Sequence, residues 1–463
     1  MSAPMKTKSG DKKSPKCSFF IKRKSRTCKF QASKDSEYCT EHLALNEDVT
    51  AGDVRKRIPC PRDPKHSVFE SKLKQHLRKC NVVKLQRSLE AEEGYAKNIN
   101  SPDPYEEDDK AVSQVTLRSV PTAEVLSLIE RVGALYNEYK VEIREDILSH
   151  DALKEEMATP GFGPAALKHL KQLASLLGQM DNMLMLHGNT CYVEFGAGKG
   201  QLSYWVQQAL SKEKDPDFLL IDRAGNRHKL DGQHRDDGGC VNSHRLKMDI
   251  EHLDLGRVPC IKNQEKPIVG MSKHLCGAAT DLCLRCVVNT LQLPSSQDTS
   301  PAAAEGKEPK LPRLEAKTGN RSRLQGLIIA LCCHHKGNWH HYCGKEFFKK
   351  CGLTARDYHI IQSLGSWAVC GVRKVPETDH ERAQEEQAEL EDDKDERQQP
   401  RFDQFSHEER EEIGRQCKRL IDIGRIKYLE SVGYRVVLKK YVSEEVTLEN
   451  VVMIVVPEDI KDS

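Results

Sequence analysis

Hydrophobic residues recur at two different spacings along this chain, and the order of the two spacings predicts its architecture. From Cys191 onward, short apolar runs typical of buried strands alternate with stretches in which apolar residues fall three and four positions apart. The expected strands are CYVEF, DFLLID, HRLKMDI, PIVGMS, QGLIIAL, YRVVLKKY and NVVMIVV, and the expected helices span 201–210, 278–291, 344–351 and 406–431. This alternation indicates an α/β protein with a doubly wound sheet.

Apolar residues at helical spacing predict two further helices before the first strand. They are expected at 121–149 and 164–178. We therefore expect a helical region at 119–180, followed by the sheet-containing domain at 181–463.

Four segments lack a pattern that could build a core. They are a disordered basic tail at 1–16, a linker at 81–118 that contains the acidic string SPDPYEEDDK, and two insertions in the main domain at about 295–322 and 376–400.

Charge is balanced in total but not along the chain. The sequence holds 72 Lys and Arg against 70 Asp and Glu, yet residues 1–100 hold 23 basic and 12 acidic ones. Residues 377–399 reverse this, with 11 acidic and 3 basic residues. A basic front end favours a polyanion such as nucleic acid, because each cation near a phosphate releases a counterion. A solvated basic tail is the alternative.

The sequence contains no run of about 20 apolar residues and no signal-peptide core at its N-terminus. We therefore expect an intracellular protein, in the cytoplasm or nucleus, where thiols stay reduced. The 17 cysteines are then thiols or metal ligands rather than disulfides. No segment points to a protein partner.

The first candidate metal site is the pattern C-x10-C-x10-C-x2-H, formed by Cys17, Cys28, Cys39 and His42. Thiolate and imidazole are the ligands that Zn²⁺ prefers, and four of them complete a tetrahedral structural site. The segment has few large apolar residues, so metal is its main means of folding. The sequence predicts a zinc module at 17–42.

A second candidate metal site follows at 60–80, where Cys60, His66, His76 and Cys80 give C-x5-H-x9-H-x3-C. His76 and Cys80 are four residues apart, so on a helix they face the same side. The sequence predicts a second zinc module of the CHHC type. Two solvated histidines on a basic helix are the alternative.

A glycine-rich turn follows the first strand of the main domain. Gly196, Gly198 and Gly200 follow Glu194 at the end of CYVEF, and a helix is expected from Gln201. Such a turn lets a ligand approach the main chain. The dinucleotide fingerprint requires a glycine at 201, so the pattern favours S-adenosylmethionine instead.

Two acids follow the next two strands. Asp222 is placed to hold ribose hydroxyls, and Asp249 is placed to reach an adenine amino group. We therefore predict a Rossmann-like methyltransferase sheet. A purely structural turn with incidental acids is the alternative.

Candidate catalytic residues follow the fourth and fifth expected strands, because ligands bind at the carboxyl ends of strands in open α/β sheets. Lys273 and His274 end the fourth strand, and His334 and His335 end the fifth. A ribose hydroxyl needs a proton acceptor before it can attack a methyl group, and any of the four could serve. Lys273 and His274 are our first choice.

Cysteines in the same region allow other interpretations. Cys332 and Cys333 could be small packed hydrophobes. Cys283 and Cys286, three apart on a helix, could join them in a third metal site, although helix cysteines more often serve packing. The string WHHYC after them could stack on a base or simply cover the site.

These features together resemble the tRNA methyltransferase 13 family. The resemblance rests on the two zinc patterns, VEFGAGKG, SKHLCGAATD (Ser272–Asp281), LCCHH (Leu331–His335) and DIGRIKYLESVGY (Asp422–Tyr434). It implies a tRNA substrate and S-adenosylmethionine-dependent methylation of the ribose 2′-hydroxyl of nucleotide 4 in certain acceptor stems. The Lys-Asp-Lys-Glu tetrad of other ribose methyltransferases is not recognisable, so the general base stays open.

Two other functions compete. A cytosine-C5 RNA methyltransferase would use Cys276, Cys332 or Cys333 as its nucleophile, but no proline adjoins these cysteines. A non-catalytic zinc-finger adaptor would carry a degenerate cofactor loop, whereas the glycines and acids here are intact.

Overall fold

The computed structural model describes residues 15–21, 26–32, 37–39, 42, 57–102, 115–225, 230, 242–291, 323–369 and 402–458. The chain divides into two compact units, Met1–Glu92 and Glu93–Ser463. The two expected insertions and residues 1–14 of the expected tail lie outside the described residues. No helix in the described part of the chain is long and apolar enough to cross a membrane.

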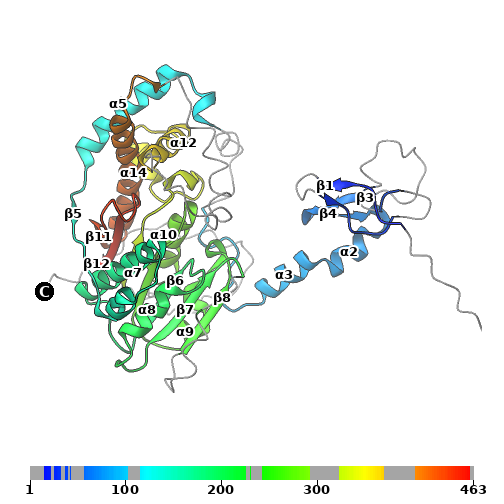
Figure 1. The fold of residues 1–463 in the computed structure, drawn as a ribbon, viewed down its shortest axis with the longest axis horizontal. Helices are drawn as coiled ribbons and strands as arrows, with labels where there is room; N and C mark the ends of the chain where they lie inside the picture. Colours follow the sequence, from blue (N-terminus) through cyan, green and yellow to red (C-terminus); the bar gives the residue numbers. More distant parts are fainter. Residues whose placement is uncertain are drawn as a thin grey trace, which may run out of the picture. The chain divides into compact units, whose positions relative to one another are not determined.

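An eight-stranded, mostly parallel sheet forms the centre of the larger unit (Figure 1). Its strands, in spatial order, are β5 (Ile143–Glu145), β11 (Tyr434–Lys440), β12 (Val451–Pro457), β10 (Leu324–Ala330), β9 (Ile268–Ser272), β6 (Cys191–Phe195), β7 (Asp217–Asp222) and β8 (Asn242–Lys247). All seven strands expected from the sequence are present. HRLKMDI is shifted, because β8 ends at Lys247 and the chain then enters a 3-10 turn at Ile250–His252.

The direction of the strands follows from their connections. Strands β8, β7, β6, β9 and β10 are parallel, whereas β12 runs antiparallel to both of its neighbours. The chain runs outward from β6 to β8 and then returns to start β9 on the other side of β6. Strand order therefore reverses between β6 and β9, and ligands of open α/β sheets bind at such a reversal.

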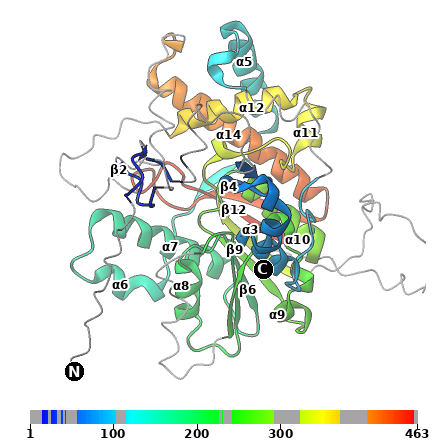
Figure 2. The same cartoon turned by 90° about the vertical axis from the view of Figure 1, so that its right-hand side faces the viewer.

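Helices cover both faces of this sheet, as Figure 2 shows for β6 and β9. Helices α7 (Pro164–Asn182) and α8 (Gln201–Ala209) cover one face, which includes Tyr192. Helix α10 (Ala278–Leu291) and the end of α14 (His407–Glu430) cover the other, with α9 (Pro259–Lys262) close by. A side chain on an inner strand is therefore buried from both sides, which explains why these strands are continuously apolar.

A second helical layer packs on the first half of α14. It consists of α5 (Thr122–Tyr139), α11 (Lys345–Lys350) and α12 (Ala355–Leu364), and a short helix α6 (Lys154–Ala158) precedes α7. The helix expected at 121–149 ends at Tyr139. Val141 and Ile143 then alternate with charged residues, the period of a strand, and β5 pairs with β11.

Among its described residues, the smaller unit contains little regular structure. It holds β1 (Phe20–Ile21), β2 (Arg26–Thr27), β3 (Arg57–Cys60), β4 (Asp63–Phe69), α2 (Leu73–Lys79) and α3 (Asn81–Glu90). Helix α3 lies within the segment expected to be a linker. Asn100, also in the segment expected to be a linker, belongs to the larger unit. Its buried side chain donates to the carbonyls of Ile250 and Leu253 at 2.6 and 2.7 Å.

Candidate functional site

The glycine turn between β6 and α8 has the backbone that its sequence requires. Gly196, Gly198 and Gly200 have φ of 66°, 52° and 83°, in the left-handed region that favours glycine. A β-carbon on Gly196 would lie 3.1 Å from the carbonyl oxygen of His274, so the turn packs against the end of β9. A β-carbon on Gly198 would meet no protein atom within 4 Å. The turn therefore has open space in front of its middle glycine.

The three acids expected at this site take different roles. Glu194 is buried, and its Oε2 accepts from the backbone N–H and hydroxyl of Ser203 at 3.0 and 2.5 Å, so it anchors the first turn of α8. Asp222 accepts from the N–H groups of Gly198 and Ala224, both at 2.7 Å. Asp249 caps the turn after β8 by accepting from Glu251 N at 3.1 Å. Asp222, at the end of β7, therefore contacts the glycine turn directly, Asp249 caps the turn after β8, and Glu194 on β6 anchors the helix that follows the glycine turn.

Lys273 lies at the carboxyl end of β9 and is only 7% exposed. Burial lowers the pKa of its ammonium to about 8, although the nearby Glu194 carboxylate opposes the change. Its Nζ lies 3.1 Å from Nδ1 of His169 on α7. The preceding Ser272 donates to Phe195 O at 2.8 Å, which joins the ends of β9 and β6. A lysine that loses its proton near neutral pH therefore sits at the reversal of strand order.

His274, the next residue, reaches solvent. The protein around its ring, together with the charge of Lys273, lowers the pKa of this imidazole to about 4. The pKa of His169 is also lowered, by burial and by Lys273. Both rings are therefore neutral at physiological pH and can accept a proton.

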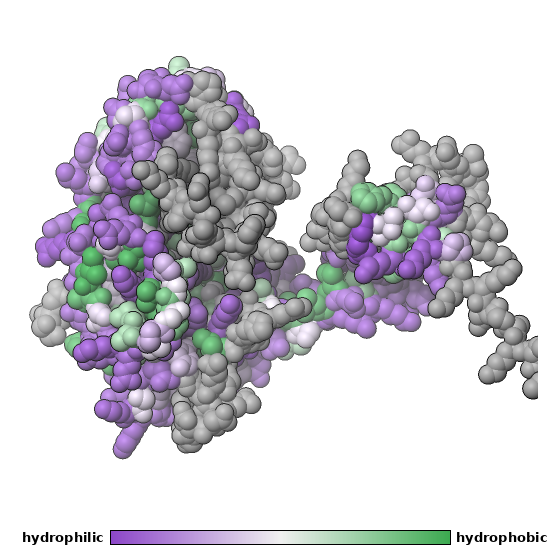
Figure 3. Space-filling model, in the orientation of Figure 1, coloured by the Kyte–Doolittle hydropathy of each residue, from purple (hydrophilic) through white to green (hydrophobic). Residues whose placement is uncertain are grey.

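Two cavities meet the Lys273–His169 pair. One, a small cavity of about 40 Å³, is lined by Gln172, Lys273, His274, Ala330, Leu331, Cys332, Tyr441, Thr447 and Glu449. The other, of about 330 Å³, is lined by His169 and by apolar and aromatic side chains that include Phe162, Leu173, Tyr204 and Trp205. Apolar side chains gather on this face of the molecule, over α7 and α8 (Figure 3). The second cavity has the size of a small-molecule site.

His334 differs from Lys273, because it belongs to a fully buried network of charges. Its Nε2 lies 2.8 Å from Asp422 on α14, and Asp422 also contacts Arg425 at 3.1 Å. Arg425 binds Asp281 on α10 through two nitrogens, at 3.1 and 2.7 Å. The network joins residues of three strings, SKHLCGAATD, LCCHH and DIGRIKYLESVGY.

This burial favours a structural role for His334 over contact with a substrate. His335 is half-buried, and its carbonyl accepts from Gln362. The two fifth-strand histidines are thus held by α14 and α12.

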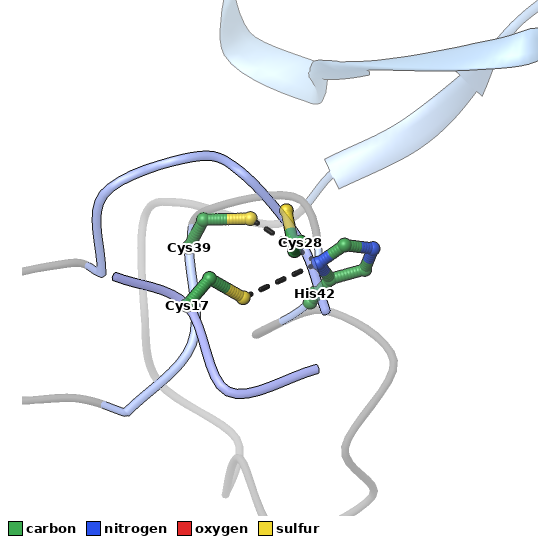
Figure 4. Close-up of side chains that lie close together, drawn as sticks. All are labelled: Cys17, Cys28, Cys39 and His42. Atoms are coloured by element: carbon green, nitrogen blue, oxygen red, sulfur yellow. Dashed lines mark hydrogen bonds between the residues drawn. The ribbon is translucent and has the colours of Figure 1, made fainter. Parts of the chain in front are cut away.

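The first zinc pattern forms a closed set of ligands. The ligand atoms of Cys17, Cys28, Cys39 and His42 lie within 4.8 Å of one another, with both Cys17 Sγ and Cys39 Sγ 3.4 Å from His42 Nδ1 (Figure 4). The three thiols are buried. Burial opposes ionisation of Cys17, but hydrogen bonds from the Cys39 and Phe19 backbone outweigh it and lower the pKa to about 6. This donor set fits a tetrahedral zinc ion.

The second zinc pattern converges in the same way. The ligand atoms of Cys60, His66, His76 and Cys80 lie within 4.8 Å of one another. His66 presents Nε2 to the other ligands, and its Nδ1 lies 3.2 Å from Asp63 Oδ2. A carboxylate behind a metal-binding histidine fixes the tautomer and the orientation of the ring. The alternative of two solvated histidines does not hold.

Three family models match the chain. A "Methyltransferase TRM13" model matches residues 171–456, a "CCCH zinc finger in TRM13 protein" model matches 15–43, and a "U11-48K-like CHHC zinc finger" model matches 57–81. The first model covers more than half of the chain. The chain belongs to the TRM13 methyltransferase family. Both zinc modules expected from the sequence are thereby confirmed, and the methyltransferase family implies S-adenosylmethionine as the methyl donor.

Relatives in the TRM13 family match nearly the whole chain. The "tRNA:m(4)X modification enzyme TRM13 homolog" of Mus musculus is 36% identical over 96% of this chain and 94% of its own length. The homologue of Homo sapiens is equally similar, and the enzyme of Yarrowia lipolytica is 30% identical over 95% of this chain and 89% of its own. No solved structure matches the chain.

Sequence patterns alone did not reveal several residues of this TRM13 site. His169 is a single histidine on the amphipathic helix α7, and nothing in its spacing separates it from a surface residue. Arg245 on β8 donates to Gly198 O at 2.9 Å, but a lone arginine within a strand carries no signal. Both contacts join residues that are more than 40 positions apart. The sequence analysis had singled out their partners, Lys273 and Gly198, but it could not predict which residues contact them.

Proposed function

We propose that this chain is an S-adenosylmethionine-dependent tRNA methyltransferase that modifies the ribose 2′-hydroxyl of nucleotide 4 in the acceptor stem of certain tRNAs. The names of the relatives support tRNA as the substrate. The order of the parallel strands and the reversal beside the glycine turn support a Rossmann-like cofactor domain. Thiol zinc ligands suit a reducing compartment, the cytoplasm or nucleus.

The cofactor would lie along the turn of Gly196, Gly198 and Gly200, where the missing side chains leave room. Bound S-adenosylmethionine supplies an electrophilic methyl group. Asp222 would bind ribose hydroxyls of the donor, since two backbone N–H groups already fix its carboxylate. Asp249 would reach the adenine amino group. Glu194 would hold the turn in shape through α8.

We assign to Lys273 the role of accepting the proton of the ribose hydroxyl that receives the methyl group. Its pKa of about 8 leaves a useful neutral fraction at physiological pH, and a neutral amine can accept the hydroxyl proton. His169 holds Nζ in place and connects it to solvent. His274 would assist at the mouth of the cavity. We assign His334 and His335 positioning roles, because α14 and α12 hold them.

The rival cytosine-C5 chemistry needs an activated thiolate. Contacts with Cys276 and Cys333, together with burial, instead raise the pKa of Cys332. As long as no metal ion is bound to it, a thiol with a raised pKa stays protonated and is a poor nucleophile. The thiol chemistry therefore favours the ribose over the base as the acceptor.

The decisive experiment measures methyl transfer from labelled S-adenosylmethionine to tRNA at several pH values, with Lys273→Arg and Lys273→Ala beside the unmodified protein. Arginine keeps the positive charge but does not lose its proton. If Lys273 is the base, both variants should lose about 10²–10⁴ in kcat. The kcat of the unmodified protein should rise through pH 8, because only the neutral lysine accepts a proton.

Two controls complete this experiment. The exposed Lys212→Ala should leave kcat unchanged, and a tRNA with a 2′-deoxyribose at nucleotide 4 should not be methylated. Full activity in Lys273→Arg would show that only the charge matters. Methylation of the deoxy substrate would overturn ribose specificity.

A further inference from the structure

We propose a third zinc site in this chain, formed by the thiols of Cys276, Cys332 and Cys333 at the carboxyl edge of the sheet. Their sulfur atoms lie within 4.8 Å of one another. The ligand atoms of each of the two zinc fingers lie within the same distance of one another. The site is separate from the fingers, because it lies in the larger unit.

The spacing of the sulfurs suits a shared metal ion. Cys276 Sγ and Cys332 Sγ lie 3.6 Å apart. Two thiolates on one tetrahedral zinc ion are about 3.8 Å apart, given a Zn–S bond of about 2.3 Å. Three protein ligands leave the fourth corner of the tetrahedron for solvent or another small ligand. Soft thiolates favour zinc over magnesium or calcium.

The backbone of the two loops brings the three thiols together. Cys333 adopts φ 44° and ψ 45°, a left-handed conformation that is strained for a residue with a side chain. Such strain is kept where the surroundings impose it. The loops also touch directly: a β-carbon on Gly277, which follows Cys276, would lie 2.0 Å from the Lys336 carbonyl oxygen. A larger residue at 277 would therefore separate the loops.

Packing does not explain these three cysteines. Cys283 and Cys286 on α10 are buried almost completely. Those two serve packing in the core and do not join the cluster. Cys276, in contrast, is exposed, and Cys332 and Cys333 are partly so. Exposure gives a metal ion a path of entry, and it removes the usual reason for a cysteine to be apolar filling.

The cluster adjoins the proposed active site. Cys332 lines the same small cavity as Lys273 and His274. The backbone N–H of Cys333 donates to Glu449 at 3.3 Å, and Glu449 lines that cavity too. A zinc ion would therefore tie the loop after β9 to the loop after β10, and so fix the wall of the cavity that carries Lys273.

Metal content of the full-length protein tests the site. Zinc per chain is measured by plasma mass spectrometry after loosely bound metal has been removed. We expect three zinc ions in the unmodified protein and two in both Cys276→Ser and Cys332→Ser. Cys351→Ser, a half-buried cysteine elsewhere, is the matched control and should keep three. Cys276 is exposed, so its serine variant will fold even if Cys332→Ser does not.

Cobalt provides a second readout. Protein produced in cobalt-containing medium should lose about three eighths of its thiolate-to-cobalt charge-transfer absorbance in Cys276→Ser, because the third site holds three of the eight thiolate ligands. Two metal ions in the unmodified protein would overturn the proposal. So would a Cys276–Cys332 disulfide found by mass spectrometry, because the pair would then be a redox couple rather than metal ligands.

Discussion

Lys273 lies in a buried environment that disfavours its charged form. Its pKa falls from 10.5 to about 8 because burial removes water from the ammonium. The unfolded chain therefore binds the proton more tightly than the folded one, and the difference destabilises the fold by about 2–3 kcal/mol at neutral pH. Such a penalty is consistent with the proposed role of Lys273, because a general base must be neutral before it can accept a proton.

Replacing Lys273 by methionine should accordingly stabilise the protein while it abolishes methyl transfer. Methionine keeps the length of the side chain and removes the buried charge. We expect the free energy of unfolding to rise by about 2–3 kcal/mol at pH 7. The penalty in the unmodified protein is complete below pH 8 and disappears toward pH 10.5, so the gain should shrink over that range. Urea denaturation at pH 7 and pH 9 measures it.

The exposed Lys212→Met is the control for this prediction and should leave the stability unchanged at both pH values. A loss of stability in Lys273→Met would mean that the ammonium makes favourable contacts that outweigh its burial.

Single residues of the site were predictable from the sequence wherever a pattern marks them. The zinc ligands, the three glycines and the acids after β7 and β8 all carry such a pattern. Glu194 carries such a pattern too, and its place at the cofactor stays a prediction; in the structure its carboxylate accepts from Ser203 in the first turn of α8. The pairing of Lys273 with His169 depends on how α7 lies across the sheet, and a one-dimensional pattern does not contain that distance.

At the scale of elements, strands were easier to predict than helices. Each inner strand is covered on both faces, so burial leaves an unbroken apolar run in the sequence. Helix α12 was missed because its segment ARDYHIIQSL has two polar residues, His359 and Gln362, on its buried side. The end of α5 was missed because the helical spacing runs directly into the alternating pattern of β5.

A single arginine joins three elements of the larger unit. Arg425 on α14 is fully buried and binds Asp281 on α10, and through Asp422 it reaches His334 after β10. Attraction to the two carboxylates raises the pKa of Arg425 against the effect of its burial. Removing one partner of such a network leaves the others charged and unpaired inside the protein.

We therefore expect Arg425→Met to lower the free energy of unfolding by about 3–5 kcal/mol. The same substitution at Arg415 is a matched control, because Arg415 lies on the same helix and forms surface ion pairs with Glu411 and Glu412, at 3.5 and 3.0 Å. An exposed pair contributes about 0–1 kcal/mol. Denaturation followed by circular dichroism compares the two variants. Equal losses would show that the buried network stabilises the fold no more than a surface ion pair does.

At the scale of the whole molecule, we propose that the smaller unit binds RNA and the larger unit catalyses methyl transfer. The smaller unit has too little apolar surface for a core, and it folds around metal ligands. Its surface is basic: Lys72, Lys74, Arg78 and Lys79 on and next to α2 are exposed. The larger unit carries the glycine turn and Lys273. On this proposal, RNA phosphates attract the smaller unit without regard to sequence, and the larger unit supplies the chemistry.

The last prediction tests this division in the full-length chain. Changing Lys72, Lys74, Arg78 and Lys79 to glutamine removes four charges but leaves the four ligands of the CHHC finger in place. The KM for tRNA should rise, and its dependence on salt should become weaker, because each phosphate contact contributes about 0.9 to the slope of log affinity against log salt. Cofactor affinity, measured by calorimetry, should stay the same.

Four exposed lysines of the larger unit serve as the matched set: Lys154, Lys212, Lys214 and Lys262. Changing them to glutamine removes the same total charge, so any effect of net charge on tRNA attraction appears equally in both variants. Only a local contact makes the finger variant weaker than the control. If the two variants bind tRNA equally well across the salt series, the finger does not contact the RNA backbone. The affinity for tRNA would then come from the larger unit.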